Sequence, residues 1–366
     1  MVYLSVNELT SGMCVDRDIN FYDASVRTAI CIRHGQKLTD VSITKMKDNG
    51  ITGAYIDDTH SKFHVLSSVS TEIKNDAISN LQSLADNFID SSKGVTQSDI
   101  AEVGGTTSKL IDALADKKDI MVNIADIKMY DDYTFHHCLS VAILAITIGM
   151  ELGLAKNELY ELGLAGLLHD IGKVSIPIEI INKNGRLTDE EYAIVKMHPI
   201  HAATHLKERK LVPQNCYLGI IAHHERWDGS GYPFKLAGEA IPFYARILAV
   251  ADVYDALTSN RPYRTPSPPS EAIEFIMGGM GSHFDETVVR AFLRKIAPYP
   301  IGSKIILSNS ETATVVKNAA DHPLRPLIRF DSTGKTLDMN EDMSSYSLVI
   351  TGLVDPNVST ADIVKS

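Results

Sequence analysis

The sequence lacks a cysteine pattern that would build a disulfide framework. The chain has 366 residues and four cysteines, which are widely scattered and form no Cys-x-x-Cys pair. In a chain of this length, scattered cysteines are typical of reduced thiols. The sequence therefore argues against a small disulfide-rich scaffold.

An excess of positive charge is also missing. Lys and Arg number 35 against 46 Asp and Glu, which gives a formal net charge of −11. Because a phosphate backbone demands clustered Lys and Arg, this balance argues against a DNA-binding or RNA-binding surface. A small anionic ligand is still compatible, since a few basic groups in one cleft can outweigh the global charge locally.

Targeting and membrane-spanning segments are not evident. The first residues, Met-Val-Tyr-Leu-Ser-Val-Asn-Glu, lack a basic region followed by an apolar stretch. The longest apolar run, from Cys138 to Met150, has 13 residues, whereas a membrane-spanning helix needs about 20. We therefore expect a cytoplasmic protein without a membrane partner.

The first 120 residues predict two segments. Residues 1–65 form a small α+β domain, with strands at 29–32 and 53–56 and a helix over 39–49 that ends at Gly50. Residues 66–120 form a helical connector. Its apolar residues recur every three or four positions, and Gly104-Gly105 is expected to interrupt this pattern.

The remaining residues predict a helical domain followed by strands. Residues 121–295 carry long amphipathic stretches, and Thr188 begins a capping box. Few strand signals occur there, which favours an all-helical bundle. Residues 296–366 form a β-rich extension, with strands expected at 302–307, 313–316, 327–330 and 347–350. The predicted fold class is thus mainly α, with a small α+β domain before the bundle and a small β-rich tail after it.

Histidines are concentrated in the helical segment. The chain has 13, and eight of them fall between His136 and His224. Histidine is the commonest metal ligand among side chains, and helical bundles build metal sites from inward side chains on several helices. Of the neighbours His136 and His137, only one can face inward, and the apolar stripe behind it favours His137. The candidate ligands are His137, His169, Asp170, His198, His223, His224 and Asp252.

Each part of this set has an ordinary structural alternative. His169-Asp170 follows an apolar helix and is equally compatible with a hydrogen-bonded pair at a helix end. The pair His223-His224 is weak evidence alone, although the glycine-rich turn after it would let a backbone approach a ligand closely. Asp252 and Asp255 share a helical face and are also suited to be salt-bridge partners.

Three motifs together resemble one family. His-Asp-Ile-Gly-Lys at 169–173 resembles the signature of the HD superfamily of metal-dependent phosphohydrolases. His-His-Glu-Arg-Trp-Asp-Gly-Ser-Gly-Tyr-Pro at 223–233 resembles the defining motif of its HD-GYP branch, and Asn-Arg-Pro-Tyr-Arg at 260–264 also fits. The resemblance covers roughly residues 121–290. Residues 1–65 are similar, more loosely, to a small domain often found ahead of HD-GYP modules.

This resemblance implies a role for each matching residue. The seven candidate ligands match metal positions, and Asp170 is expected to bridge two metals. Lys173 matches a catalytic lysine near the scissile phosphate, while Tyr232, Arg261 and Arg264 match substrate-binding positions. Some members place a Glu four residues before the first ligand histidine, where it helps to hold a third metal. Here that residue is Tyr133, so a two-metal site is expected.

The resemblance also implies an activity. The expected reaction is the opening of cyclic di-GMP to linear pGpG, with a further cut to GMP left open. Iron or manganese is favoured, and Ni, Co and Zn are also compatible with imidazole and carboxylate ligands. The same chemistry on 3′,3′-cyclic GMP-AMP, and a signalling protein that binds nucleotide without cleaving it, remain as alternatives. Other signalling proteins are conceivable partners, and the oligomeric state is left open.

Overall fold

The fold comes from a computed structural model of the full chain. The residues that it describes are 2–6, 9–15, 18–23, 28–48, 51, 53–56, 69–89, 94–115, 122–123, 133–181, 183, 185–259, 267–299, 301–319 and 322–353. The chain divides into two compact units. One comprises Met1–Ser67, Met121–Asp131 and Ile296–Ser366, and the other comprises Ser68–Ile120 and Asp132–Lys295. The division into four segments that the sequence suggests stays a prediction.

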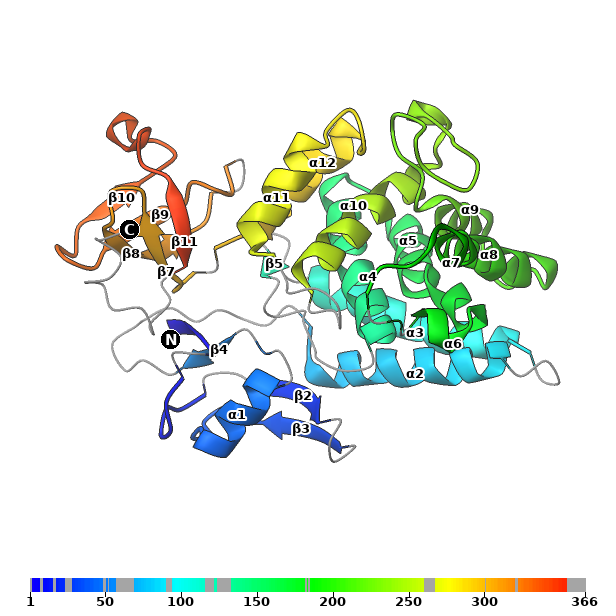
Figure 1. Ribbon diagram of the computed structural model, residues 1–366, viewed down its shortest axis with the longest axis horizontal. Helices are drawn as coiled ribbons and strands as arrows, with labels where there is room; N and C mark the ends of the chain where they lie inside the picture. The colour runs from blue at the N-terminus through cyan, green and yellow to red at the C-terminus, as the bar shows by residue number, and fades with distance from the viewer. Residues whose placement is uncertain are drawn as a thin grey trace. The chain divides into compact units, whose positions relative to one another are not determined.

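The second unit is a helical bundle built around α4 (Tyr133–Glu151). The apolar run in this helix is buried on all sides, as expected for a helix at the centre of a bundle. It packs against α5, α10 and α12, and Figure 1 shows α4 surrounded by these helices. The bundle comprises α2 (Thr71–Ile89), α3 (Gln97–Ala115), α4, α5 (Lys156–Leu168), η2 (Ile171–Ser175), α6 (Ile178–Ile181), α7 (Asp189–Val195), α8 (His198–Glu208), α9 (Gln214–Ala222), η3 (Gly238–Ala240), α10 (Phe243–Thr258), α11 (Pro269–Gly278) and α12 (Glu286–Lys295).

The expected interruption at Gly104-Gly105 is wrong. Helix α3 runs without a break from Gln97 to Ala115. A Cβ atom on Gly104 would lie 2.1 Å from the hydroxyl oxygen of Tyr160 on α5. Glycine at position 104 therefore allows α5 to pack closely against α3, so the residue marks a helix contact and not a helix end.

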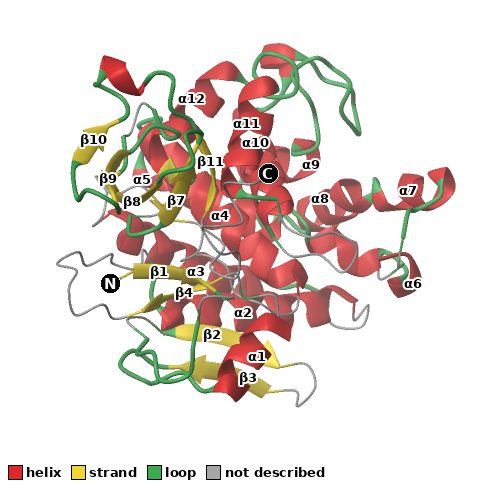
Figure 2. Cartoon of the chain, turned by 60° about the vertical axis from the view of Figure 1, so that its left-hand side comes forward, coloured by secondary structure: helices red, strands yellow, loops and turns green. Residues whose placement is uncertain are grey.

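Helices α6 and α7 form an arm that extends from the bundle (Figure 2). The predicted capping box is confirmed, because the Thr188 hydroxyl accepts from the Glu191 N–H and the Glu191 carboxylate accepts from the Thr188 N–H. Lys183 also forms an ion pair with Glu191. These contacts give the short helix α7 a defined start.

The first unit holds the strands. The N-terminal part pairs β1 (Val2–Ser5) with β4 (Gly53–Ile56) and β2 (Ile19–Asp23) with β3 (Thr28–Ile32), around α1 (Asp40–Asp48). Its core includes Val15, Leu38 and Met46. The two strands and the helix predicted here are confirmed, and the expected helix end at Gly50 lies outside the described residues. A two-residue parallel pair joins β5 (Val122–Asn123) to β6 (Ile296–Ala297).

The C-terminal part is one antiparallel sheet in the order β10-β9-β8-β7-β11. Its strands are β7 (Lys304–Leu307), β8 (Thr312–Lys317), β9 (Leu327–Phe330), β10 (Thr336–Asp338) and β11 (Ile350–Leu353), with η4 (Met343–Ser345) before the last. The expected strand over 347–350 was placed too early, because Leu348 donates to the Ser345 carbonyl in a turn. The mainly α fold class, with a small β-rich C-terminal part, is confirmed.

Among the residues described, none of the helices has the length and apolar character needed to cross a membrane.

Candidate metal centre

The seven residues predicted as metal ligands come together in the helical bundle, mostly at helix ends. They are His137 in α4, His169 at the end of α5, Asp170 at the start of η2, His198 at the start of α8, His223 and His224 after α9, and Asp252 in α10. Except for His224, all are buried, with at most 7% of the residue exposed. Burying so many ionisable groups is costly unless a partner compensates for the lost hydration.

The ligand atoms form two groups that share one carboxylate. Atoms of Asp170, His198, His223 and His224 all lie within 4.8 Å of one another, and the same holds for His137, His169 and Asp170. Asp170 therefore stands between two sets of potential ligands. Asp252 adjoins both sets, since it lies 3.0 Å from Nε2 of His137 and 3.6 Å from Nδ1 of His224.

The main chain fixes the tautomer of three histidines. Each directs Nδ1 at the carbonyl oxygen three residues earlier, at or near the end of a helix. The pairs are His169 with Gly166 at 2.8 Å, His198 with Val195 at 2.7 Å, and His223 with Ile220 at 2.6 Å. Because a carbonyl oxygen only accepts, Nδ1 must donate, and Nε2 of each neutral ring is left with its lone pair.

The unprotonated Nε2 atoms of these rings lie close together and cannot hydrogen-bond to one another. Nε2 of His198 lies 3.4 Å from Nε2 of His223, and with Nδ1 protonated on both rings neither can donate to the other. Nε2 of His169 is buried without a hydrogen-bond partner. Inward lone pairs beside buried carboxylates are the donor set of a divalent cation, so the residues present fit the metal that the sequence predicts.

His137 is held differently, by two carboxylates of α10. Its Nδ1 lies 2.7 Å from Oδ2 of Asp255, and its Nε2 lies 3.0 Å from Oδ1 of Asp252. Burial alone would lower the pKa of His137, but the two carboxylates outweigh it and raise the pKa to about 9. Both Asp residues are thus partners of one histidine, and Asp255 occupies the position that orients a ligand ring from behind.

Burial and neighbouring charges keep His223 and His224 neutral and Asp170 ionised. Burial, with the neighbouring histidines, holds the pKa of His223 well below its ordinary value, and partial burial in the cluster also lowers the pKa of His224. Burial would raise the pKa of Asp170, but Lys173 and the surrounding histidines hold it well below its usual range. Neutral imidazoles and ionised carboxylates are the forms that bind metal.

The first motif supplies one further charged group beside the cluster. Nζ of Lys173 lies 2.5 Å from Oδ2 of Asp170, and the lysine side chain is 24% exposed. This cation therefore borders both the cluster and solvent. The glycine before it is required by packing, because a Cβ on Gly172 would lie 2.0 Å from the His198 carbonyl oxygen.

The second motif folds a loop over His224. The Tyr232 ring stacks on His224, with centroids 4.7 Å apart and an interplanar angle of 30°. Gly231 lies against the backbone of Glu225, since a Cβ there would come within 2.5 Å of the Glu225 Cα. The buried Glu225 carboxylate accepts from the N–H groups of Phe234 at 2.6 Å and Leu236 at 3.1 Å.

Sequence reasoning missed the role of Glu225. A glutamate directly before a glycine-rich loop, whose backbone N–H groups need acceptors, was the available signal. Three other expectations lie outside what the structure describes. Arg261 and Arg264 belong to the undescribed residues 260–266, and nothing is described of the Tyr133 side chain.

Comparisons with known proteins match the part of the chain that carries this cluster. Residues 109–288 match the family model of the HD domain. A cyclic di-GMP phosphodiesterase of Pseudomonas aeruginosa is 40% identical over 209 residues, which are 57% of this chain and 50% of that protein. The cyclic di-GMP phosphodiesterase PdeB of Borreliella burgdorferi is 30% identical over 64% of this chain and 60% of that protein.

A third relative carries a different name. The 3′3′-cGAMP-specific phosphodiesterase 2 of Vibrio cholerae is 36% identical over 50% of this chain and 36% of that protein. The chain therefore spans about half the length of the first relative and less than two thirds of the others.

The buried histidine and aspartate cluster at converging helix ends, together with the family match, defines a protein with an HD domain, which implies binding of divalent metal. Residues 109–288 therefore form an HD domain, and the Gly-Tyr-Pro sequence at 231–233 resembles the motif of the HD-GYP branch of the HD superfamily.

Proposed function

We propose that this protein is a metal-dependent phosphodiesterase that hydrolyses cyclic di-GMP to linear pGpG. The observation that carries the proposal is the convergence of fixed, unprotonated Nε2 atoms on Asp170, with the Lys173 cation beside them. Relatives that carry the name cyclic di-GMP phosphodiesterase support the substrate class. The net charge of −11 supports a small nucleotide over a nucleic acid.

Two divalent ions, with iron or manganese favoured, suit the two ligand groups. His198, His223 and His224 would hold one ion, His137 and His169 the other, with Asp170 bridging and Asp252 adjoining both. Bound ions of this kind polarise a phosphodiester and provide a nucleophile from water at neutral pH.

The side chains around the cluster would position the substrate. In the expected hydrolysis, the oxygen of water bonds to phosphorus and the bond from phosphorus to the 3′ oxygen breaks. One proton of the water ends on that 3′ oxygen. Lys173 would offset negative charge on the phosphate as this bond breaks. Tyr232, Arg261 and Arg264 would hold the remainder of the substrate, the arginines by charge-assisted bonds to phosphate oxygens.

Replacement of Asp170 tests the proposal. Asp170→Asn keeps the shape of the side chain but removes the charge shared by both ligand groups. We expect loss of cyclic di-GMP cleavage and of bound metal, with the circular dichroism spectrum unchanged. Asp112→Asn is the matched control, because the Asp112 side chain is 66% exposed and pairs with Lys156. Full activity in Asp170→Asn, or in metal-free protein, would refute the proposal.

A second substrate is favoured by one comparison. The Vibrio cholerae relative named for 3′3′-cGAMP is 36% identical to this chain, nearly as similar as the relatives named for cyclic di-GMP. Turnover of both dinucleotides by the same metal-loaded preparation, compared as kcat/KM, decides between them. A protein that binds nucleotide without cleaving it is disfavoured, since the chain retains every predicted ligand.

A further inference from the structure

The arm formed by α6 and α7 places an aromatic ring and a cation next to the loop that carries Gly231, Tyr232 and Pro233, here called the GYP loop. The Lys196 ammonium lies 4.3 Å from the centroid of the Tyr192 ring and 5.7 Å from that of Tyr232. Tyr232 in turn stacks on the predicted ligand His224. One tyrosine ring therefore separates Lys196 from the metal-ligand cluster.

Lys196 differs from the other lysines near the site. Lys173 is paired with Asp170, and Lys183 is paired with Glu191. Within the described part of the chain, Lys196 has its two tyrosine rings and no carboxylate partner. A contact between an ammonium and an aromatic ring at a partly exposed position is weaker than a charge-assisted bond to phosphate. The Lys196 ammonium can therefore leave the ring and bind a substrate phosphate.

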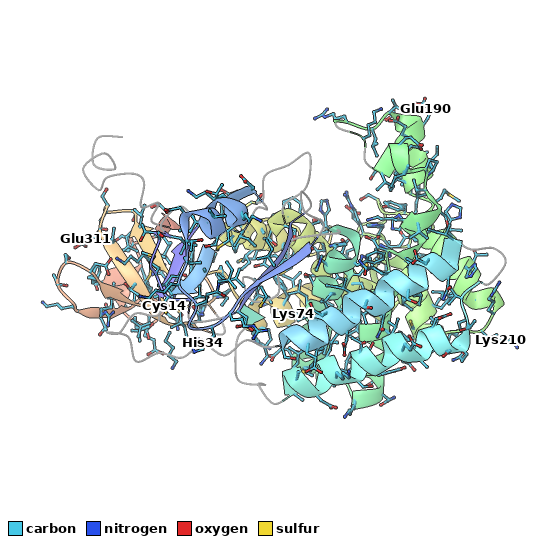
Figure 3. All side chains as sticks on the ribbon, turned by 90° about the horizontal axis from the view of Figure 1, so that it is seen from below. Cys14, His34, Lys74, Glu190, Lys210 and Glu311 are labelled. Carbon is cyan, nitrogen blue, oxygen red and sulfur yellow. The ribbon has the colours of Figure 1, made fainter. Side chains whose placement is uncertain are left out.

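Tyr192 is available on the same arm. The residue is 46% exposed, and Ile178, Ile194 and Met197 on the arm are also exposed. Figure 3 shows how far this arm extends from the bundle, with Glu190 at its outer end. An exposed tyrosine ring beside a cation is suited to stack on a nucleobase.

We propose that Lys196 and Tyr192 form a substrate-binding subsite, in which Lys196 contacts the phosphate that is not cleaved and Tyr192 stacks on a base. This inference rests on the proposed function. A cyclic dinucleotide carries two phosphates and two bases, whereas the metal centre receives one phosphate. The second phosphate needs a cation outside the centre, and the arm supplies one.

Substitution of Lys196 by methionine tests the subsite. Lys196→Met keeps the length of the side chain and removes its charge. We compare kcat/KM for cyclic di-GMP with kcat/KM for bis(p-nitrophenyl) phosphate, which has one phosphate and no base. We expect the ratio of the two to fall about tenfold through KM, and Lys196→Arg to restore it. Tyr192→Ala is expected to lower the same ratio by a similar factor and Tyr192→Phe to preserve it.

Lys207→Met is the matched control. Lys207 also lies over a tyrosine, 5.0 Å from the ring centroid of Tyr217, but on α8 and not on the arm. In Lys207→Met, the ratio of kcat/KM for cyclic di-GMP to kcat/KM for bis(p-nitrophenyl) phosphate should equal that of the unmodified protein. An unchanged ratio in Lys196→Met, or equal losses on both substrates, would overturn the subsite.

Binding separates this inference from the proposed function. The dissociation constant for cyclic di-GMP is measured by calorimetry with the metal-loaded protein and with Lys196→Met. A tenfold weaker affinity in the variant supports the subsite even if the unmodified protein does not cleave the dinucleotide, a result that would refute only the proposed function. Equal affinities, or no binding by either protein, would overturn the subsite.

Discussion

Glu225 offers a sharp test of how the GYP loop is held over the metal centre. The residue is 3% exposed, and its carboxylate accepts hydrogen bonds from the backbone N–H groups of Phe234 and Leu236. Substitution by alanine removes two hydrogen bonds to a charged acceptor, and since each contributes about 1.5 kcal/mol or more, the loss is roughly 3 kcal/mol together. For a unit of this size, that corresponds to a fall in Tm of about 6–12 °C.

The same change should also weaken substrate binding. The loop carries Tyr232, which stacks on His224, and a loosened loop no longer fixes this ring. We expect KM for cyclic di-GMP to rise about tenfold in Glu225→Ala, with a smaller change in kcat, because a stacked base contributes about 1–3 kcal/mol. Glu225→Gln should lie between, since its amide retains one acceptor but turns a donor toward the other N–H.

Thermal unfolding, initial rates and metal content together test whether Glu225 holds the loop in place. The exposed Glu239, close to the same loop, provides a control, and Glu239→Ala should match the unmodified protein in all three measurements. Bound metal should stay at its normal level in Glu225→Ala, because Glu225 is outside both ligand groups. Loss of metal, or a variant with unchanged Tm and KM, would refute this reasoning.

Three further predictions concern the metal centre. Asp255→Asn keeps an acceptor for His137 but removes its charge, so metal affinity should fall about 10–100-fold, and activity should return when excess metal is titrated in. Gly172→Ala should lose metal by elemental analysis, because the added Cβ meets the His198 carbonyl, whereas Gly105→Ala, which meets nothing within 4 Å, should keep it. Chelation should lower Tm, and re-addition of the ion should raise it again with the logarithm of the free ion concentration above the dissociation constant. An unchanged Tm after chelation would contradict metal binding to the folded state.

The residues that the sequence proposed as ligands cluster in the structure, and for the two adjacent pairs the reason is local, because each pair follows an apolar helix. His169-Asp170 follows an apolar helix, and His223-His224 follows another. What the sequence could not predict are contacts between distant segments. The bond from Asp255 to His137 spans 118 positions, and nothing in the local pattern of α10 distinguishes it from a surface ion pair.

Glycine shows the same limit. Gly104-Gly105 was read as an interruption, since glycine weakens a helix by about 1 kcal/mol relative to alanine. The structure places Tyr160 against Gly104, so the packing of α5 compensates for the local cost. Helix propensity is a property of one segment. The residue that makes glycine favourable at position 104 is Tyr160, which lies 56 positions away in the sequence.

The position of the ligands at helix ends explains why two of the motifs are adjacent pairs. Within a helix, neighbouring side chains diverge by about 100°, so two successive residues cannot face one centre. The backbone leaves the regular helix at both pairs, with φ −99° and ψ 0° at Asp170 and ψ −12° at His223. There, too, the last carbonyls of a helix lack intrahelical donors, and the Nδ1 groups of His169 and His223 supply them. One bond thus caps the helix and turns Nε2 toward the centre. A substitution that lets α5 or α9 continue as regular helix through the pair would turn the two side chains apart. It should therefore disrupt metal binding even if every predicted ligand is retained.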